Sequence, residues 1–107
     1  MTHAIDALFA TIAARKAEGD AGKSYTAKLL AAGVEKCAKK MGEEAVETAL
    51  AAVLGNKDHI AAESADLLYH LAVLWAAAGI TPEDVYAKLR AREGQSGLAE
   101  KASRKND

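Results

Sequence analysis

The sequence predicts an all-α protein, and three observations support this fold class. Alanine, the strongest helix former, makes up about a quarter of the 107 residues. Aromatic residues, which favour strands, contribute only 5%, and proline occurs once, at Pro82. Apolar residues recur at helical spacing, and no segment shows the alternation of a half-buried strand. With 50% hydrophobic and 27% charged residues, the chain has the composition of a folded protein.

Three helices are predicted in the first half of the chain. The first covers residues 4–18, where apolar side chains recur at i, i+3, i+4 and i+7. A short helix follows, capped by Ser24 or Thr26 and ending at Gly33. A long helix is then predicted over residues 34–54. Gly42 within this helix lowers its stability by about 1 kcal/mol relative to alanine. Either another group approaches the backbone closely at this position, or the glycine has no structural role.

The second half of the chain predicts two more helices. A turn at residues 55–58 leads into a helix that we expect to be capped by Asp58 and to reach about residue 78. Thr81 followed by Pro82 marks a further start, and that helix is predicted to reach about residue 93. We therefore predict a small helical bundle built on one long antiparallel helix hairpin. Residues 1–94 are predicted to form a single domain, and residues 95–107 a polar C-terminal tail.

Charge and cysteine content exclude several classes of protein. A net charge of −1 and a pI near 6.3 provide no broad basic field, which argues against a nucleic-acid partner. One cysteine, Cys37, excludes an intramolecular disulfide or a multi-thiolate zinc site and is interpreted as a small apolar residue. The longest mostly apolar stretch, residues 71–80, is too short to span a bilayer, and no signal peptide is visible. We expect a soluble cytoplasmic protein with no membrane partner.

Two acidic pairs lie on the two arms of the predicted hairpin. Glu44 and Glu47 are three residues apart, as are Glu63 and Asp66, so each pair projects from one helix face. Measured from Asn56, Glu47 lies nine residues before the bend and Asp66 ten residues after it. At about 1.5 Å per residue both lie roughly 14–15 Å from the bend. Antiparallel packing therefore places the pairs at nearly the same height.

The same acids are predicted to border the hydrophobic seam between the two helices. Glu47 leads at i+3 and i+7 into Leu50 and Leu54, and the second pair leads into His70 and Val73. Crowded carboxylates repel one another unless a cation joins them. An all-oxygen set suits a hard divalent cation, above all Mg²⁺, for which Mn²⁺ is a substitute. We therefore expect an acidic cage that binds Mg²⁺ and holds a polyphosphate.

The acids also allow other interpretations. Glutamates on alanine-rich helices are commonly solvated surface residues, in which case the chain is a helical interaction module without Mg²⁺-dependent activity. A di-iron carboxylate bundle requires a Glu-x-x-His step, whereas His70 follows Asp66 at i+4, so this interpretation is disfavoured.

Polar and basic residues around the acids are candidates for contacts with the substrate. Lysines one turn before the first acidic pair can bind phosphate, or pair instead with Glu43 and Glu44 at i+4. The ring of Tyr25 and the hydroxyl of Thr26, between the first two helices, can contact a base or a ribose. Basic residues in the tail can contact phosphate. The predicted substrate-binding residues are Lys39, Lys40, Tyr25, Thr26, Lys101 and Arg104.

With these residues in view, the chain resembles the phosphoribosyl-ATP pyrophosphatases, a family of the MazG-like all-α pyrophosphohydrolases. The resemblance lies in Ser-Tyr-Thr at 24–26, Lys-Lys-Met-Gly-Glu-Glu-Ala-Val-Glu at 39–47 and Glu-Ser-Ala-Asp-Leu-Leu-Tyr-His-Leu at 63–71. It extends through residues 85–92 to Glu100-Lys101 and so covers nearly the whole chain. The general Glu-Glu-x-x-Glu…Glu-x-x-Asp pattern is shared across the wider superfamily and does not fix the substrate.

The resemblance implies a bundle completed by dimerisation, a homodimer or a higher homo-oligomer, with sites near the subunit contacts. It implies hydrolysis of 1-(5-phosphoribosyl)-ATP to 1-(5-phosphoribosyl)-AMP and pyrophosphate, the second step of histidine biosynthesis, with Mg²⁺ as cofactor. The implied metal ligands are Glu44, Glu47, Glu63 and Asp66, and either Glu43 or Glu44 is the catalytic base. The alternative is a house-cleaning MazG-like nucleoside triphosphate pyrophosphatase, which shares the acids but does not have to accept a second phosphoribosyl group.

Overall fold

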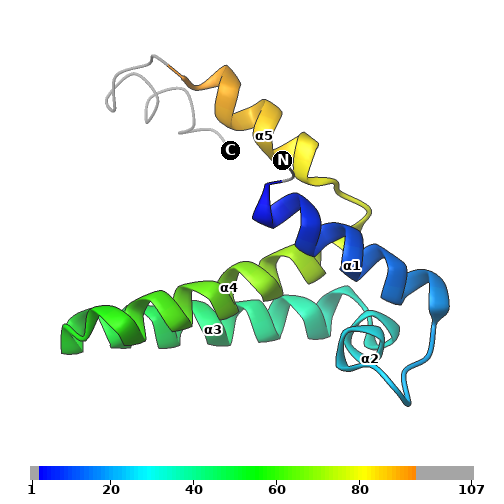
Figure 1. Ribbon diagram of the computed structural model, residues 1–107, viewed down its shortest axis with the longest axis horizontal. Coiled ribbons are helices and arrows are strands. Elements are labelled where there is room, and N and C mark those ends of the chain that lie inside the picture. Colours follow the sequence, from blue (N-terminus) through cyan, green and yellow to red (C-terminus); the bar gives the residue numbers. More distant parts are fainter. Residues whose placement is uncertain (1–2, 94–107) are drawn as a thin grey trace.

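The computed structural model describes residues 3–93, and all of the regular structure in this range is helical. The predicted all-α fold class is confirmed. Figure 1 shows α3 and α4 side by side, α2 at one end of this pair, and α1 crossing α4. The helices of this described part are α1 (Ala4–Glu18), α2 (Tyr25–Ala32), α3 (Val34–Leu54), α4 (Lys57–Ala78) and α5 (Pro82–Ala91).

A tight turn joins α3 to α4 and makes them antiparallel. Gly55 adopts a left-handed conformation (φ 79°), which glycine accepts without a steric cost. Asn56 then caps α4, because its side-chain oxygen accepts a hydrogen bond from the backbone N–H of His59 at 3.0 Å. The expectation that Asp58 is the cap was wrong: Asn56 accepts the hydrogen bond that defines the cap, and the helix begins at Lys57, one residue before Asp58.

The short helix α2 is fixed at its start and against α4. Ser24 is the cap, accepting from the N–H of Ala27 at 3.1 Å. The other candidate cap, Thr26, lies inside the helix, and its hydroxyl is hydrogen-bonded to the hydroxyl of Tyr69 on α4. This contact ties α2 to α4 at Tyr69, one turn after Asp66.

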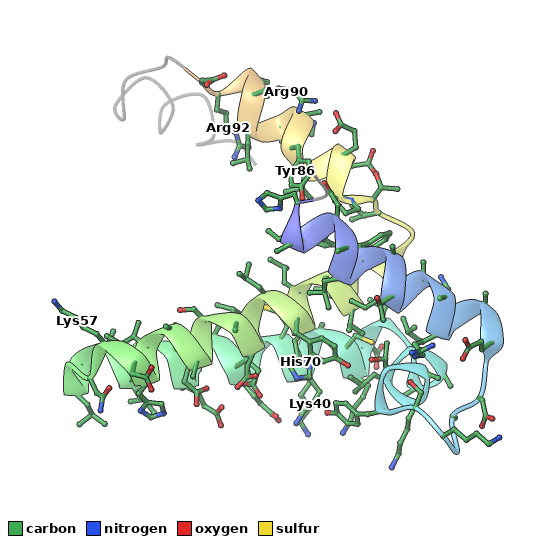
Figure 2. All side chains as sticks on the ribbon, in the orientation of Figure 1. Lys40, Lys57, His70, Tyr86, Arg90 and Arg92 are labelled. Carbon is green, nitrogen blue, oxygen red and sulfur yellow. The ribbon has the colours of Figure 1, made fainter. Side chains whose placement is uncertain are left out.

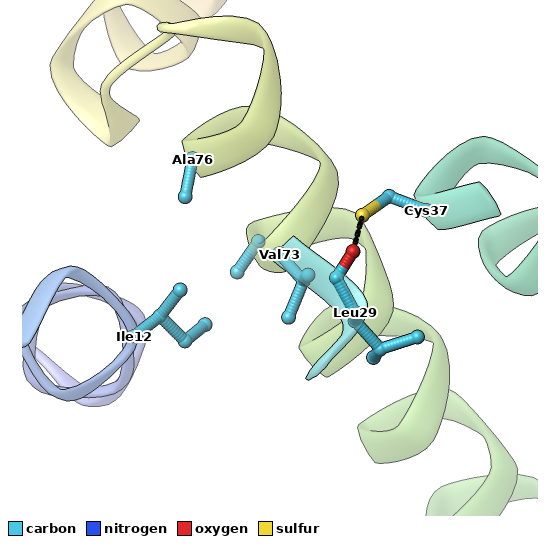
Figure 3. Packing of buried hydrophobic residues seen from close by; sticks show 6 residues of the cluster. Ile12, Leu29, Cys37, Val73 and Ala76 are labelled. Carbon is cyan, nitrogen blue, oxygen red and sulfur yellow. Dashed lines mark hydrogen bonds between the residues drawn. The ribbon is translucent and has the colours of Figure 1, made fainter. Parts of the chain in front are cut away.

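The hydrophobic core lies where α1 and α2 meet one end of the hairpin (Figure 3). Cys37 is fully buried in it, and its thiol donates to the carbonyl oxygen of Leu29 at 3.3 Å. Burial raises the pKa of the Cys37 thiol, which keeps the sulfur protonated. The structure therefore agrees with the interpretation of this cysteine as a small apolar core residue. The buried members are Ile12, Leu29, Cys37, Ala72, Val73 and Ala76.

The other end of the hairpin differs from the prediction. Leu50 and Leu54, expected at the helix seam, are 59% and 78% exposed, and the buried seam residue between them is Ala51. A small residue lets the two helices approach closely, so the leucines are turned outward. A side chain at Gly42 would meet nothing within 4 Å, which excludes close approach within residues 3–93 as the reason for this glycine.

Helix α5 begins as predicted, with a capping box between Thr81 and Asp84 and Pro82 in the first turn. It ends at Ala91, slightly before the expected residue 93. In Figure 1 it extends away from α1, to which it is tied by a hydrogen bond from the hydroxyl of Tyr86 to Asp6 at 3.1 Å.

No single helix within residues 3–93 is long and apolar enough to cross a membrane, and α4 with α5 qualifies only by length and composition, as a pair bent by 106°. The predicted tail, residues 95–107, lies outside the described residues.

Candidate active site

Three acidic side chains from the two hairpin helices converge on one point. One carboxylate oxygen from each of Glu44, Glu63 and Asp66 lies within 4.8 Å of the other two. Glu44 comes from α3, and the other two come from successive turns of α4. We call these three residues the acid cluster. The matched heights expected from the sequence thus bring together three of the four predicted metal ligands.

A residue that the sequence analysis did not consider fixes the register of the acid cluster. The single hydroxyl hydrogen of Thr48 on α3 is shared between two acceptors: the Glu44 carbonyl of its own helix, at 2.8 Å, and the Glu63 carbonyl of α4, at 3.2 Å. A threonine that bonds the carbonyl four residues earlier is common in helices and gives no signal in a sequence. Only the neighbouring helix turns this hydroxyl into a link between the two arms.

The acid cluster carries unfavourable electrostatics in the protein alone. Burial, then the neighbouring Glu47, and then Asp66 and Glu63 raise the pKa of Glu44. The Oε2 atoms of Glu44 and Glu63 are buried and have no hydrogen-bond partner among residues 3–93. Buried carboxylate oxygens without a partner are costly. A cation shared between them would satisfy both oxygens and offset the repulsion.

The remaining two predicted acids lie outside this group. Glu47 is exposed, although it is close enough to Glu44 to affect its pKa. Glu43 is also exposed and pairs with Lys40, whose ammonium nitrogen lies 3.1 Å from a Glu43 oxygen. This pairing lowers the pKa of Glu43. The lysine therefore pairs at i,i+3, not at the i,i+4 spacing that we considered from the sequence.

His70, a buried residue of α4, lies beside the acid cluster. Its Nε2 is 3.9 Å from Oε1 of Glu44, and its side chain is buried. Burial lowers the pKa of His70, so the ring is neutral at neutral pH and the contact is not an ion pair. The rings of Tyr69 and Tyr25 meet it edge-on, at centroid distances of 4.9 and 6.3 Å. The sequence offered one signal for this neighbour, its i+4 spacing from Asp66.

The predicted substrate-binding residues are distributed unevenly. Tyr25 is 54% exposed beside His70, and Lys40 lies next to the acids; Figure 2 shows Lys40 and His70 near each other at α2. The hydroxyl of Thr26 is already engaged by Tyr69, and Lys39 is exposed on α3. Lys101 and Arg104 lie outside the described residues.

The chain is similar to known proteins over most of its length. A family model described as phosphoribosyl-ATP pyrophosphohydrolase matches residues 5–93. Proteins named phosphoribosyl-ATP pyrophosphatase are 63% identical in Parvibaculum lavamentivorans (94% of this chain, 91% of that one) and 58% identical in Azospirillum brasilense (95% and 91%). A protein of the same name in Cereibacter sphaeroides is 56% identical (94% and 96%). The chain therefore belongs to the phosphoribosyl-ATP pyrophosphohydrolase family.

Proposed function

We propose that the acid cluster, loaded with Mg²⁺, is where this chain cleaves its substrate, by attack of water on the α-phosphorus. The chain is a hydrolase, and its reaction is the hydrolysis of phosphoribosyl-ATP in histidine biosynthesis, the activity that the relatives' names carry. The products are phosphoribosyl-AMP and pyrophosphate. The observation that supports the site is the convergence of three carboxylates from two helices, two of them with buried oxygens that have no hydrogen-bond partner within residues 3–93.

The donor set fits a hard divalent cation. Family membership suggests a divalent-metal requirement, and the ligand atoms of the acid cluster are all carboxylate oxygens. Mg²⁺ binds through a few carboxylates and keeps positions for water and phosphate, and Mn²⁺ accepts the same ligands. We propose Glu44, Glu63 and Asp66 as ligands, with exposed Glu47 beside them completing the set on loading. An iron site would favour a histidine among the ligands, whereas His70 lies outside this all-oxygen group.

The chemistry divides between the metal and the side chains around it. Mg²⁺ held by Glu44, Glu63 and Asp66 would lower the pKa of a coordinated water and neutralise phosphate charge. A carboxylate then takes the proton as the water oxygen bonds to the α-phosphorus and the bond to the bridging oxygen breaks. Either Glu43 or Glu44, adjacent residues on α3, takes this proton. Lys39 and Lys40 stabilise the negative charge of the departing pyrophosphate.

We also propose that a second copy of the chain packs on the outer face of α3. Four apolar side chains there are exposed: Val46, Leu50, Val53 and Leu54, with Val53 at 84%. A stripe of this kind on a small protein is typical of an interaction site. Leu50 and Leu54 also line a cavity of ≈ 290 Å³ together with Glu47 and Glu63, so the interface between the two copies would adjoin the acids. Sedimentation equilibrium should give at least twice the chain mass, and Val53→Glu should give the monomer; a monomeric wild-type protein would contradict the proposal.

A substrate with several negative charges does not cross membranes, so we place the enzyme in the cytoplasm. Pyrophosphate release should be measured for phosphoribosyl-ATP and for a panel of nucleoside triphosphates, with Mg²⁺ and with a chelator. We expect kcat/KM for phosphoribosyl-ATP to exceed the others by at least about 100-fold, with no release in chelator. Equal rates across the panel would instead favour the house-cleaning enzyme, and no release from any substrate would favour an interaction module. Turnover in ¹⁸O-water should label phosphoribosyl-AMP, whereas label in pyrophosphate would exclude attack at the α-phosphorus.

A further inference from the structure

A second concave site lies beside the acid cluster, between α2 and α3. It has a volume of ≈ 240 Å³. Residues 25, 28, 29 and 32 occupy one face of α2, and residues 36 and 40 occupy successive turns of α3 facing it. Sites for drug-sized ligands are roughly 300–1,000 Å³, so this one suits one end of a nucleotide and not the whole molecule. The residues that line this site, which we call the lysine cavity, are Tyr25, Lys28, Leu29, Ala32, Lys36 and Lys40.

The lysine cavity is cationic, and none of the residues between 3 and 93 that line it is acidic. Three of its six residues are lysines. Lys40 is paired with Glu43, but the ammonium groups of Lys28 and Lys36 form no ion pair within residues 3–93. Both of these side chains are exposed, so an anion can reach them from solvent. Like charges that converge on a concave surface attract a multiply charged anion such as a phosphate.

Two residues connect the lysine cavity to the acid cluster. The ring of Tyr25 meets His70 edge-on at 6.3 Å, and His70 in turn lies 3.9 Å from Glu44. Lys40 lines the cavity and pairs with Glu43, the residue next to Glu44. The cavity and the acids are therefore adjacent regions of one surface, and one extended ligand can reach both.

The substrate of the proposed reaction carries phosphate at both of its ends. Its triphosphate must lie at the acid cluster for the α-phosphorus to be attacked, and the carboxylates there repel any phosphate that brings no metal. The phosphate on the far ribose therefore needs a separate cationic site. We propose that Lys28 and Lys36 bind this phosphate in the lysine cavity, while the triphosphate lies at the acid cluster. This inference rests on the proposed function.

The test compares the effect of lysine variants on KM for phosphoribosyl-ATP with their effect on inhibition by pyrophosphate, the product released from the triphosphate end. In the double variant Lys28→Ala/Lys36→Ala, we expect KM for phosphoribosyl-ATP to rise by about tenfold or more while kcat changes little, because binding is lost at a point remote from the bond that breaks. Inhibition by inorganic pyrophosphate should be unchanged. The variant Lys28→Arg/Lys36→Arg should restore KM to near the wild-type value. Lys57→Ala is the matched control, because this exposed lysine lies at the opposite end of the hairpin (Figure 2).

Each other outcome overturns a specific claim. An unchanged KM in the double variant, with wild-type turnover intact, would refute the lysine cavity and leave the proposed function standing. Weaker inhibition by pyrophosphate in the variant would place the triphosphate end in the cavity instead. A wild-type protein that does not hydrolyse phosphoribosyl-ATP would refute the proposed function itself. Because both lysines are exposed, the variants should keep the wild-type helical circular-dichroism spectrum and melting temperature, which are measured in parallel.

Discussion

The side-chain hydroxyl of Thr48 on α3 lies 3.2 Å from the main-chain carbonyl oxygen of Glu63 on α4 and donates a hydrogen bond to it. The same hydroxyl bonds the carbonyl of Glu44, so one side chain joins the backbones that carry two members of the acid cluster. A displacement along either helix would break this link. Thr48 therefore holds the register of the acids through their backbone carbonyls, and it need not touch the substrate to do so.

Removing the Thr48 hydroxyl should loosen the acid cluster. We expect Thr48→Val to cost about 1 kcal/mol in the free energy of unfolding, the usual size of one lost hydrogen bond, and to raise the Mg²⁺ concentration needed for half-maximal activity. Thr48→Ser keeps the hydroxyl and should keep the wild-type metal response. Urea unfolding and Mg²⁺ titration of activity measure the two effects. A valine variant with the wild-type metal response would show that the contact does not position the acids.

Glu44→Gln should stabilise the metal-free protein while removing its activity. The pKa of Glu44 is raised above its ordinary value of 4.5 by burial and by the neighbouring carboxylates, so its ionisation opposes folding. The stability that its protonated form contributes is complete below pH 4.5 and is lost as the pH rises through the raised pKa. The melting temperatures of variant and wild type should therefore differ little near pH 4 and most at neutral pH, with the variant higher.

The same variant has a second signature. Mg²⁺ should raise the melting temperature of the wild type, because an ion that binds only the folded form stabilises it, and should have little effect on Glu44→Gln. Turnover should fall on the order of 10²–10³-fold. A variant that melts below the wild type in chelator at neutral pH would contradict the electrostatic account of the acid cluster.

Glu47 and Glu43 should respond differently to loss of charge. Glu47→Gln is expected to abolish turnover with the helical spectrum intact, because Glu47 is beside Glu44 and is proposed to complete the metal ligands. Glu43→Gln should cost about tenfold or less, because Glu43 is exposed and its charge is engaged by Lys40. Steady-state kinetics of both variants decide the matter. Retained activity in Glu47→Gln would count against its place in the site, and loss of all activity in Glu43→Gln would favour Glu43 as the base.

Cys37 should be unreactive in the folded protein and should make stability fall at alkaline pH. Burial raises the pKa of this thiol above its ordinary value of 9.0. Its contribution to stability is complete below pH 9.0 and is lost as the pH rises through the raised value. A thiol reagent should therefore label the protein at pH 8 only after denaturation. Labelling of the native protein at the rate of a free thiol would contradict the buried position, and Cys37→Ala should show a smaller alkaline loss of melting temperature.

The sequence predicted those features of the fold that depend on local chemistry. Helix ends set by Ser24, Thr81 and Pro82 follow from hydrogen bonds within one or two turns, so a pattern of residues is enough to place them. The cap of α4 was missed because Asn56 and Asp58 are both good caps, and only the geometry of the turn selects between them. The helix hairpin was predictable because both arms are long and joined by a short turn.

The site was predictable in part for the same reason. Counting residues from the bend placed Glu47 and Asp66 at equal heights, but it could not decide which way each side chain turns about its helix. The structure brings Glu44, not Glu47, into the three-oxygen group. Contacts that cross between helices, such as Thr48 with Glu63, leave no periodic trace in a sequence. The lysine cavity likewise combines residues of α2 and α3, so the sequence alone did not predict Lys28 and Lys36 as site residues.

Locating a bound ion tests the central claim most directly. Crystals of the protein grown with Mn²⁺ give anomalous scattering that marks the metal independently of any mechanism. We predict a peak between the carboxylates of Glu44, Glu63 and Asp66, and its loss in Glu44→Gln crystals grown under the same conditions. An anomalous peak elsewhere on the chain, or none among these acids at a concentration that supports full activity, would contradict the account.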